Sequence, residues 1–473
     1  MDKRIILFEL NEVPLRIIDQ YCIWRPESAL ARYLPHCYQY ETYAEDIGHL
    51  SPWKTWPTVH RGVTNERHMI TDFGQDLSEQ NKEFPPVWDI LAKNGVKPGI
   101  CGSLHTYPPP KNFENYAFFL PDTFAAGTES FPPELELFQK FNLAMARESA
   151  RNVSSGIAWR DALAMLRKSS DLGLRLRTYA NIGGQLVEER LQSWRKCRRR
   201  TYQAVLGFDL FMRQLDKFRP QFATFFTNHV AATQHRYWAA AFPADYEQLG
   251  YDEQWIATYR NEIEFAMEKF DSFFARLAAF VERNRQYTLW VTTSMGQAAT
   301  EANALETQLY LTDPAKLTAA LGLDPSDWEQ RPAMLPQWSV LVRPAKEEQF
   351  ESALQALTID GRPVSFRRAA GGFFSVDFGH PNLHHRTDAI QFKGRTMGPD
   401  DLGLQHMEIQ DKSGTCAYHI PQGTLLVYDA DRPNPHQSGH RPQISTVDIA
   451  PTILHNYSVP VPQYMAQPVS IGG

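Results

Sequence analysis

The sequence predicts an α/β fold in which a mostly parallel sheet carries helices on both faces. Short apolar runs rich in β-branched and aromatic residues alternate with long stretches whose apolar residues recur every three or four positions. This alternation favours parallel pairing, because a crossover helix returns each strand to the same edge of the sheet. In such sheets ligands bind beyond the carboxyl ends of the strands. The residues that follow each apolar run are therefore the candidate site residues.

Four apolar runs are expected to form buried strands, because each is followed by a turn-forming or polar residue. They cover residues 5–10, 222–227, 287–293 and 424–429. Long helical stretches lie between them, and the clearest covers residues 253–284.

Two stretches interrupt the alternation. Residues of about 135–205 are expected to form a helical cap beside the active-site edge, and this cap turns basic at 194–200. A solvated helix end explains that charge, and binding of an anion is the alternative. Residues 338–412 show a β-α-β-β pattern typical of a small inserted α+β subdomain. The expected core then comprises residues 1–337, including the cap, together with residues 413–473.

Composition places the chain among ordinary globular proteins. It has 473 residues, 43% of them hydrophobic, and a net charge of −6 gives no reason to expect nucleic acid as a partner. The first apolar run is too short for a signal peptide, and no stretch reaches about 18 apolar residues, so we expect a cytoplasmic protein without a membrane span. The five cysteines are scattered without a CxxC spacing and are expected to be reduced thiols.

Two segments carry a family resemblance. The first is SPWKTWPTVHRGVTNERHMI at 51–70, and the second combines HIPQGTLLVYDADRP at 419–433 with STVDIAPTILHNYSVPVPQYM at 445–465. They resemble the nucleophile and C-terminal segments of the alkaline-phosphatase superfamily, in its type I phosphodiesterase and nucleotide-pyrophosphatase branch. With FTNHVAATQHRYW at 226–238 and TTSMGQ at 292–297, the resemblance spans nearly the whole chain outside the two insertions.

The resemblance implies phosphoryl transfer at two metal ions, usually zinc, with Thr55 as nucleophile or substrate-contacting hydroxyl. Several ligands of that pattern are replaced in this chain. Asn11 stands where the family has Asp, Ala231 stands where it has another Asp, and Ser294-Met295 replace an Asp-His pair. A two-metal site is therefore not expected.

One zinc or manganese ion remains an option, because His235 and His419 are kept and Glu12 can complete three protein ligands. Alternative third donors are Asn228 and His229. The catalytic candidates are Thr55, Lys54 and Asn11, and the substrate-binding candidates are Asn228, His229, Ser294 and Gln297. Each candidate also has a structural interpretation: Thr55 as a helix-capping hydroxyl, and the histidines as hydrogen-bonded core residues. Without a metal, the same neutral and basic groups would still favour an anion.

The favoured function is a divergent hydrolase or transferase acting on a phosphoester or related anionic small molecule or glycan. Proteins resembling it are linked to nucleotide-sugar and surface-polysaccharide metabolism. The alternative is a metal-depleted pseudoenzyme that binds a glycan, nucleotide or protein partner without turnover. The oligomeric state stays open. Further histidines, expected in surface or cleft loops, stand at 380, 384, 385, 406, 436 and 440.

Overall fold

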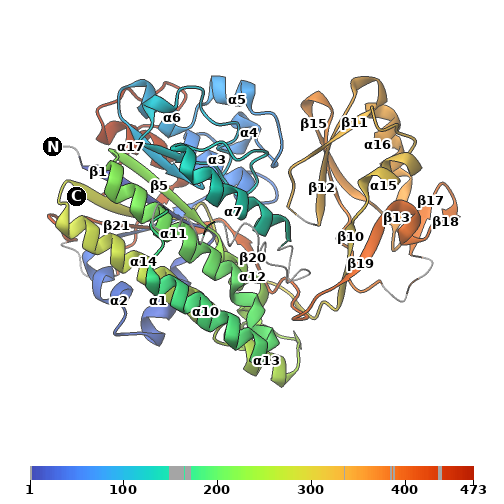
Figure 1. Ribbon diagram of the computed structural model, residues 1–473, viewed down its shortest axis with the longest axis horizontal. Helices are drawn as coiled ribbons and strands as arrows, with labels where there is room; N and C mark the ends of the chain where they lie inside the picture. Colours follow the sequence, from blue (N-terminus) through green and yellow to red (C-terminus); the bar gives the residue numbers. More distant parts are fainter. Residues whose placement is uncertain are drawn as a thin grey trace.

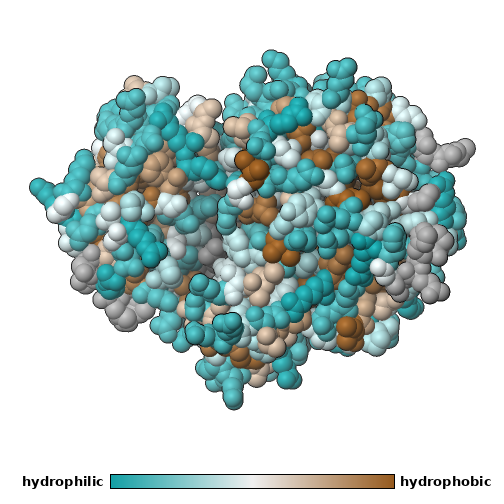
Figure 2. All heavy atoms as spheres, turned by 180° about the vertical axis from the view of Figure 1, so that it is seen from behind, coloured by the Kyte–Doolittle hydropathy of each residue, from teal (hydrophilic) through white to brown (hydrophobic). Residues whose placement is uncertain are grey.

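A computed structural model describes residues 3–148, 165, 172–334, 336–383, 386, 389–434 and 439–472. The chain forms a larger lobe, which contains the main sheet, and a smaller lobe built from antiparallel strands and the helices α15 and α16 (Figure 1). The face shown in Figure 2 is mostly hydrophilic, with hydrophobic residues in small separate groups. None of the helices among the described residues combines the length and apolar character that crossing a bilayer requires.

The predicted mostly parallel sheet is confirmed. In the described part of the chain the main sheet has eight strands, in the order β22-β2-β21-β7-β1-β5-β3-β4. Their bounds in that order are Gln443–Ser445, Tyr38–Tyr43, Gln422–Tyr428, Tyr287–Thr292, Arg4–Leu10, Phe222–Thr227, Pro98–Cys101 and Phe118–Leu120. β21 runs antiparallel to both of its neighbours, β7 and β2, and the other pairings are parallel.

Alternate residues of β1 enter two separate cores, as a strand period of two requires. Ile6 and Phe8 belong to the cluster that faces α1, α11, α12 and α14, whereas Ile5 and Leu7 belong to the cluster that faces α3, α6 and α17. The bounds of these helices are Leu15–Trp24, Arg199–Phe218, His229–Ala241, Glu262–Arg283, Pro52–Arg61, Val87–Lys93 and Ile449–Asn456. The central strand is thus buried on both faces, which explains its continuous apolar run.

The four expected strands correspond to β1, β5, β7 and β21. The helical stretch at 253–284 differs, because it is divided into α13 (Glu253–Tyr259) and α14 (Glu262–Arg283). Apolar spacing continues across the break, so it does not reveal the boundary. Asp252 caps α13 by accepting a hydrogen bond from the Trp255 N–H.

The expected helical cap contains α7 (Glu136–Glu148) and α10 (Leu176–Leu191), which are followed by α11. Residues 149–164 and 166–171 of this stretch lie outside the described residues. The basic segment at 194–200 is largely ion-paired: Arg198 contacts Glu262 at 2.6 Å, and Arg199 contacts Glu189 at 2.6 Å. These carboxylates supply a structural partner for the positive charge.

The smaller lobe contains the elements of the predicted β-α-β-β pattern as β12 (Gln337–Val342), α16 (Glu347–Gln355), β15 (Ser365–Ala369) and β16 (Phe373–Asp377). Two short strands, β13 (Leu357–Ile359) and β14 (Arg362–Pro363), lie between α16 and β15 and were not predicted. The lobe also contains β11 (Trp328–Arg331) and α15 (Pro314–Ala320). β10 (Thr307–Leu311) and β19 (Leu404–Glu408) pair antiparallel, and their leucines join the lobe's own hydrophobic cluster. We propose these paired strands as the limits of the lobe, in place of residues 338 and 412.

Candidate functional site

A cavity of about 1270 Å³ lies between the two lobes. Ligand sites typically measure about 300–1,000 Å³, so the space admits a substrate larger than a simple phosphate ester. Asn11 and Glu12, which follow β1, and Asn228, which follows β5, line it. The cavity therefore occupies the carboxyl edge of the parallel strands, where the alternation of elements predicts a site.

Glu12, His235 and His419 come together at this cavity. Oε2 of Glu12 lies 2.8 Å from Nε2 of His235 and 3.3 Å from Nε2 of His419. One ligand atom from each of the three side chains lies within 4.8 Å of the others, and no second such group occurs among the described residues. The structure thus brings together the three residues predicted as metal ligands.

Each of the three residues comes from a different element. Glu12 follows β1, His235 lies in the second turn of α12, and His419 lies on β20 (Ala417–Ile420). β20 comes just before β21, which runs opposite to the rest of the sheet. Its reversed direction places the residues before β21 at the same edge as the residues after β1 and β5.

The Nδ1 atoms of the two histidines fix the orientation of their rings. Nδ1 of His235 donates to the carbonyl of Ala417 and Nδ1 of His419 donates to the carbonyl of Leu50, both at 2.7 Å. Both Nε2 atoms therefore face the carboxylate. An unprotonated Nε2 carries a lone pair and would repel the Glu12 carboxylate. The three side chains therefore require shared positive charge, either protons or a metal ion. Nε2 of His419 is buried without a hydrogen-bond partner, which fits a metal ligand.

Charge is balanced within this group. Burial alone would raise the pKa of Glu12, but His419 and His235 outweigh it and hold the pKa of that carboxyl well below its ordinary value. Burial would lower the pKa of His419, yet the Glu12 carboxylate raises it above 6.5. Two imidazoles and one carboxylate suit zinc or manganese and leave coordination positions for water or substrate.

Glu12 is held in place by its neighbours. Its backbone adopts a left-handed conformation with φ of 57°, which costs energy for a non-glycine residue and is often found at functional sites. The Asn11 amide donates to Oε1 of Glu12, and the Gln297 amide donates to Oε2. Gln297 also pairs with His419 across the strands β8 (Gly296–Ala299) and β20. Asn11 and Gln297 therefore position the carboxylate; we find Gln297 outside the cavity lining, although it was predicted to bind substrate.

Thr55 does not line the cavity. Its hydroxyl is fully buried and is placed to donate to the Ser51 carbonyl at 3.2 Å and to the Ser294 hydroxyl at 2.8 Å. Ser294 is buried as well and likewise lies outside the lining. These contacts match the structural interpretation of Thr55 rather than a hydroxyl that meets substrate.

Ser51 is a hydroxyl-bearing residue of this segment that does line the cavity. It precedes α3, which begins at Pro52, but its side chain makes no capping hydrogen bond. Its Oγ is buried without a partner, which is costly unless a ligand satisfies it. Sequence reasoning missed Ser51, although a Ser-Pro pair marks a helix start.

The start of α3 is fixed by contacts from outside the helix. Pro57 has no N–H and so leaves the Trp53 carbonyl without its usual helical partner. The ring Nε2 of His105 donates to that carbonyl at 2.8 Å. At the other end, Gly62 terminates the helix with a φ of 63°.

Lys54, Asn228 and His229 all line the cavity, but they differ in their hydrogen bonding. Lys54 lines the cavity and donates to the His49 carbonyl at 2.8 Å. Asn228 lines the cavity and accepts from the Asn11 amide at 2.7 Å. His229 is satisfied internally, because Nε2 donates to the Ala266 carbonyl and Nδ1 accepts from Thr227, and burial lowers its pKa to about 4. A neutral, bonded His229 is a poor third ligand.

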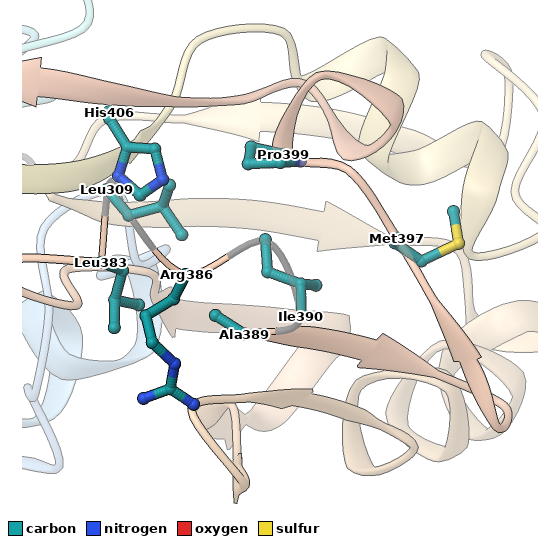
Figure 3. Close-up of a pocket in the computed structure, with 8 residues that line it drawn as sticks. All are labelled: Leu309, Leu383, Arg386, Ala389, Ile390, Met397, Pro399 and His406. Carbon is teal, nitrogen blue, oxygen red and sulfur yellow. The ribbon is translucent and has the colours of Figure 1, made fainter.

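The other predicted histidines that the structure describes do not join this group. His406 lies on β19 in the smaller lobe and lines a cavity of about 10 Å³ with Leu309 and Arg386, room for about one water molecule (Figure 3). His380 is half-buried, and His440 is exposed. His384, His385 and His436 lie outside the described residues.

No protein-family model and no curated protein matches the sequence. Among solved structures, the chain is similar to murine ectonucleotide pyrophosphatase/phosphodiesterase 5, with 10% identity, 97% of this chain and 96% of that chain covered, and a TM-score of 0.44. An inactive variant of the murine protein in complex with AMP gives the same values. The human protein shows 9% identity over 99% of this chain and 97% of that chain, with a TM-score of 0.41. These likenesses decide neither activity nor substrate.

Proposed function

We propose that this protein is a hydrolase or transferase of a phosphoester or related anionic substrate that uses one zinc or manganese ion. The observation that carries the proposal is the convergence of Glu12 Oε2, His235 Nε2 and His419 Nε2 at the edge of a large cavity. When bound, such an ion polarises a phosphoryl oxygen or activates a water molecule.

The surrounding side chains have separate tasks in this proposal. Asn11 and Gln297 hold the Glu12 carboxylate. Lys54 neutralises negative charge on the substrate. Ser51, at the amino end of α3, takes the role predicted for Thr55, because the residue lines the cavity and its buried hydroxyl has no hydrogen-bond partner among the described residues. The partial positive charge of the helix end favours an anionic group beside it.

The volume of the cavity supports a substrate with a sizeable second part, such as a nucleotide sugar or a glycan phosphate. The five cysteines are all unpaired in the structure, which favours a reducing compartment and supports the cytoplasmic location predicted from the sequence.

The test combines metal content with turnover. Protein purified without chelator is analysed for zinc and manganese, and hydrolysis of a generic aryl phosphodiester is measured with and without each metal. We expect about one ion per chain, and loss of both metal and turnover in His235→Ala. His36→Ala, which removes an exposed imidazole outside the cavity lining, is the matched control.

The pseudoenzyme alternative makes a different prediction. Metal-free protein that neither binds added zinc nor turns over any phosphoester would contradict the proposed activity. Binding of a nucleotide sugar without turnover would then support the alternative.

A further inference from the structure

The smaller lobe sends two arginines to the cavity, Arg331 from β11 and Arg367 from β15. Both contact the loop that follows α4 (Asn65–His68) in the larger lobe. Arg331 donates to the Gly74 carbonyl through Nε and to Glu329 through Nη1, both at 3.1 Å. These bonds occupy its guanidinium on two sides, as expected for a residue that holds the lobes together.

Arg367 is bonded on one side only. Its Nη2 donates to the carboxylate of Asp72 and, at 3.3 Å, to the carbonyl of Thr71. Nη1 makes no hydrogen bond with any described residue, and Nε is buried without a partner. The side chain is 41% exposed, whereas that of Asp72 is 4% exposed. Part of the guanidinium fork is therefore left for a ligand.

Lys54 presents a second cation to the same cavity. Lys54 is buried, and the one hydrogen bond of its ammonium among the described residues goes to the His49 carbonyl. None of the described carboxylates lies within ion-pair distance of Nζ. Burial lowers the pKa of Lys54, and the charge of Arg367 lowers it further. Asp72 and, less strongly, Asp46 offset the charge of Lys54. Asp72 is already held by Arg367, and Asp46 by Thr58 and the Asn65 N–H, so neither carboxylate pairs directly with the ammonium.

We infer that Arg367 and Lys54 together bind a phosphate-type oxyanion between the lobes, with Asp72 as the intramolecular competitor for Arg367. A guanidinium fork matches two oxygens of such an anion, while an ammonium adds a point charge. The inference deepens the proposed function, because it assigns to the smaller lobe the recognition of the substrate's anionic group.

The next residue along β15 provides a matched control. Arg368 pairs with Glu347 and, at 2.6 Å, with Glu351, both within the smaller lobe, and it does not line the cavity. Arg367→Gln and Arg368→Gln remove the same charge from adjacent positions on opposite faces of one strand.

The experiment is calorimetric titration of inorganic phosphate into chelator-treated protein. We expect Arg367→Gln to weaken phosphate binding about ten- to a hundredfold, the range for loss of a charge-assisted hydrogen bond. Arg368→Gln should stay within about twofold of the parent. Asp72→Asn should keep or strengthen binding, because it releases Arg367 from its competitor.

The Asp72→Asn variant distinguishes two roles of Arg367, binding phosphate and only holding the two lobes together. If Arg367 only held the lobes together, Asp72→Asn and Arg367→Gln would break the same ion pair and weaken binding alike. That result, unchanged binding in Arg367→Gln, or no phosphate binding by the parent protein would overturn the inference. Thermal unfolding of each variant verifies that it is folded.

Failure of this inference and failure of the proposed function are distinguishable. Phosphate binding is measured without metal, and so does not depend on Glu12, His235 and His419 holding an ion. If the protein binds phosphate through Arg367 but has neither metal nor turnover, the inferred oxyanion site is supported and the proposed hydrolase or transferase activity is contradicted.

Discussion

Oε2 of Glu12 lies 2.8 Å from Nε2 of His235, although the first residue follows β1 and the second lies within α12. Nδ1 of His235 already donates to the Ala417 carbonyl. The contact therefore requires a cation, a proton or a metal ion, between the carboxylate and the imidazole.

Replacing Glu12 by Gln should abolish tight zinc binding. The amide keeps the size of the side chain but removes the negative charge, so the affinity should fall by more than the roughly 10- to 100-fold expected for loss of an outer partner. Calorimetric zinc titration measures this, with Glu45→Gln, an exposed site, as control. Zinc affinity equal to that of the parent would show that Glu12 is not a ligand.

Gln297→Ala should weaken zinc binding about 10- to 100-fold without abolishing it, because it removes a donor that holds the Glu12 carboxylate. Gln39→Ala is the control, since Gln39 is also a buried glutamine but bonds the Leu34 carbonyl. An equal change in both variants would indicate a general loss of stability. Zinc titration together with thermal unfolding distinguishes a specific effect on the Glu12 carboxylate from a general loss of stability.

Ser51→Ala and Thr55→Val should have opposite effects. Ser51→Ala removes a buried oxygen that has no partner, so we expect unchanged or higher stability and at least about a hundredfold lower turnover. Thr55→Val removes two hydrogen bonds, so we expect a stability loss of about 1–3 kcal/mol and retained turnover. Denaturant unfolding and phosphodiester turnover are the measurements. Full activity in Ser51→Ala would return the catalytic role to Thr55.

Asp46 predicts a pH dependence of stability. Burial raises its pKa from 3.8 to about 6, even though Thr58 and the Asn65 N–H donate to it. Because the folded state binds this proton more tightly than the unfolded state, protonation of Asp46 adds to the free energy of unfolding. The added stability is fully present below about pH 4 and is lost as the pH rises to about 6. Asp46→Asn should lack that decline and gain about 1–3 kcal/mol at pH 7 relative to the parent. Chemical unfolding from pH 4 to 7.5 tests this, and parallel curves for the two proteins would contradict it.

Local pattern predicted the strands well, and three side chains picked from the sequence lie together in the structure. β5 was predicted at its observed bounds, because an apolar β-branched and aromatic run followed by Asn228 has few other interpretations. Glu12, His235 and His419 were predicted as metal ligands from their places after strands and in family-like segments, and the structure brings them together.

Other features depend on contacts that the sequence does not display. Thr55 matches a motif, but only the fold shows that its hydroxyl points to Ser51 and Ser294 instead of the cavity. Arg367 lies in an ordinary strand pattern, and Arg368 looks equivalent to it in the sequence. The alternation of side chains on β15 and the docking of the lobes decide which arginine reaches the cavity.

The sequence by itself determined the α/β class and the edge of the sheet where a site is expected, because these depend on periodicity. The family resemblance picked out His235 and His419, and Glu12 was the nearby carboxylate proposed to join them. The tertiary structure alone decided that Ser51 and Arg367 line the cavity while Thr55 and Arg368 do not, and which ring nitrogen of each histidine faces Glu12. Those outcomes depend on partners distant in sequence, such as the Leu50 and Ala417 carbonyls, and only packing of the whole chain brings them into contact.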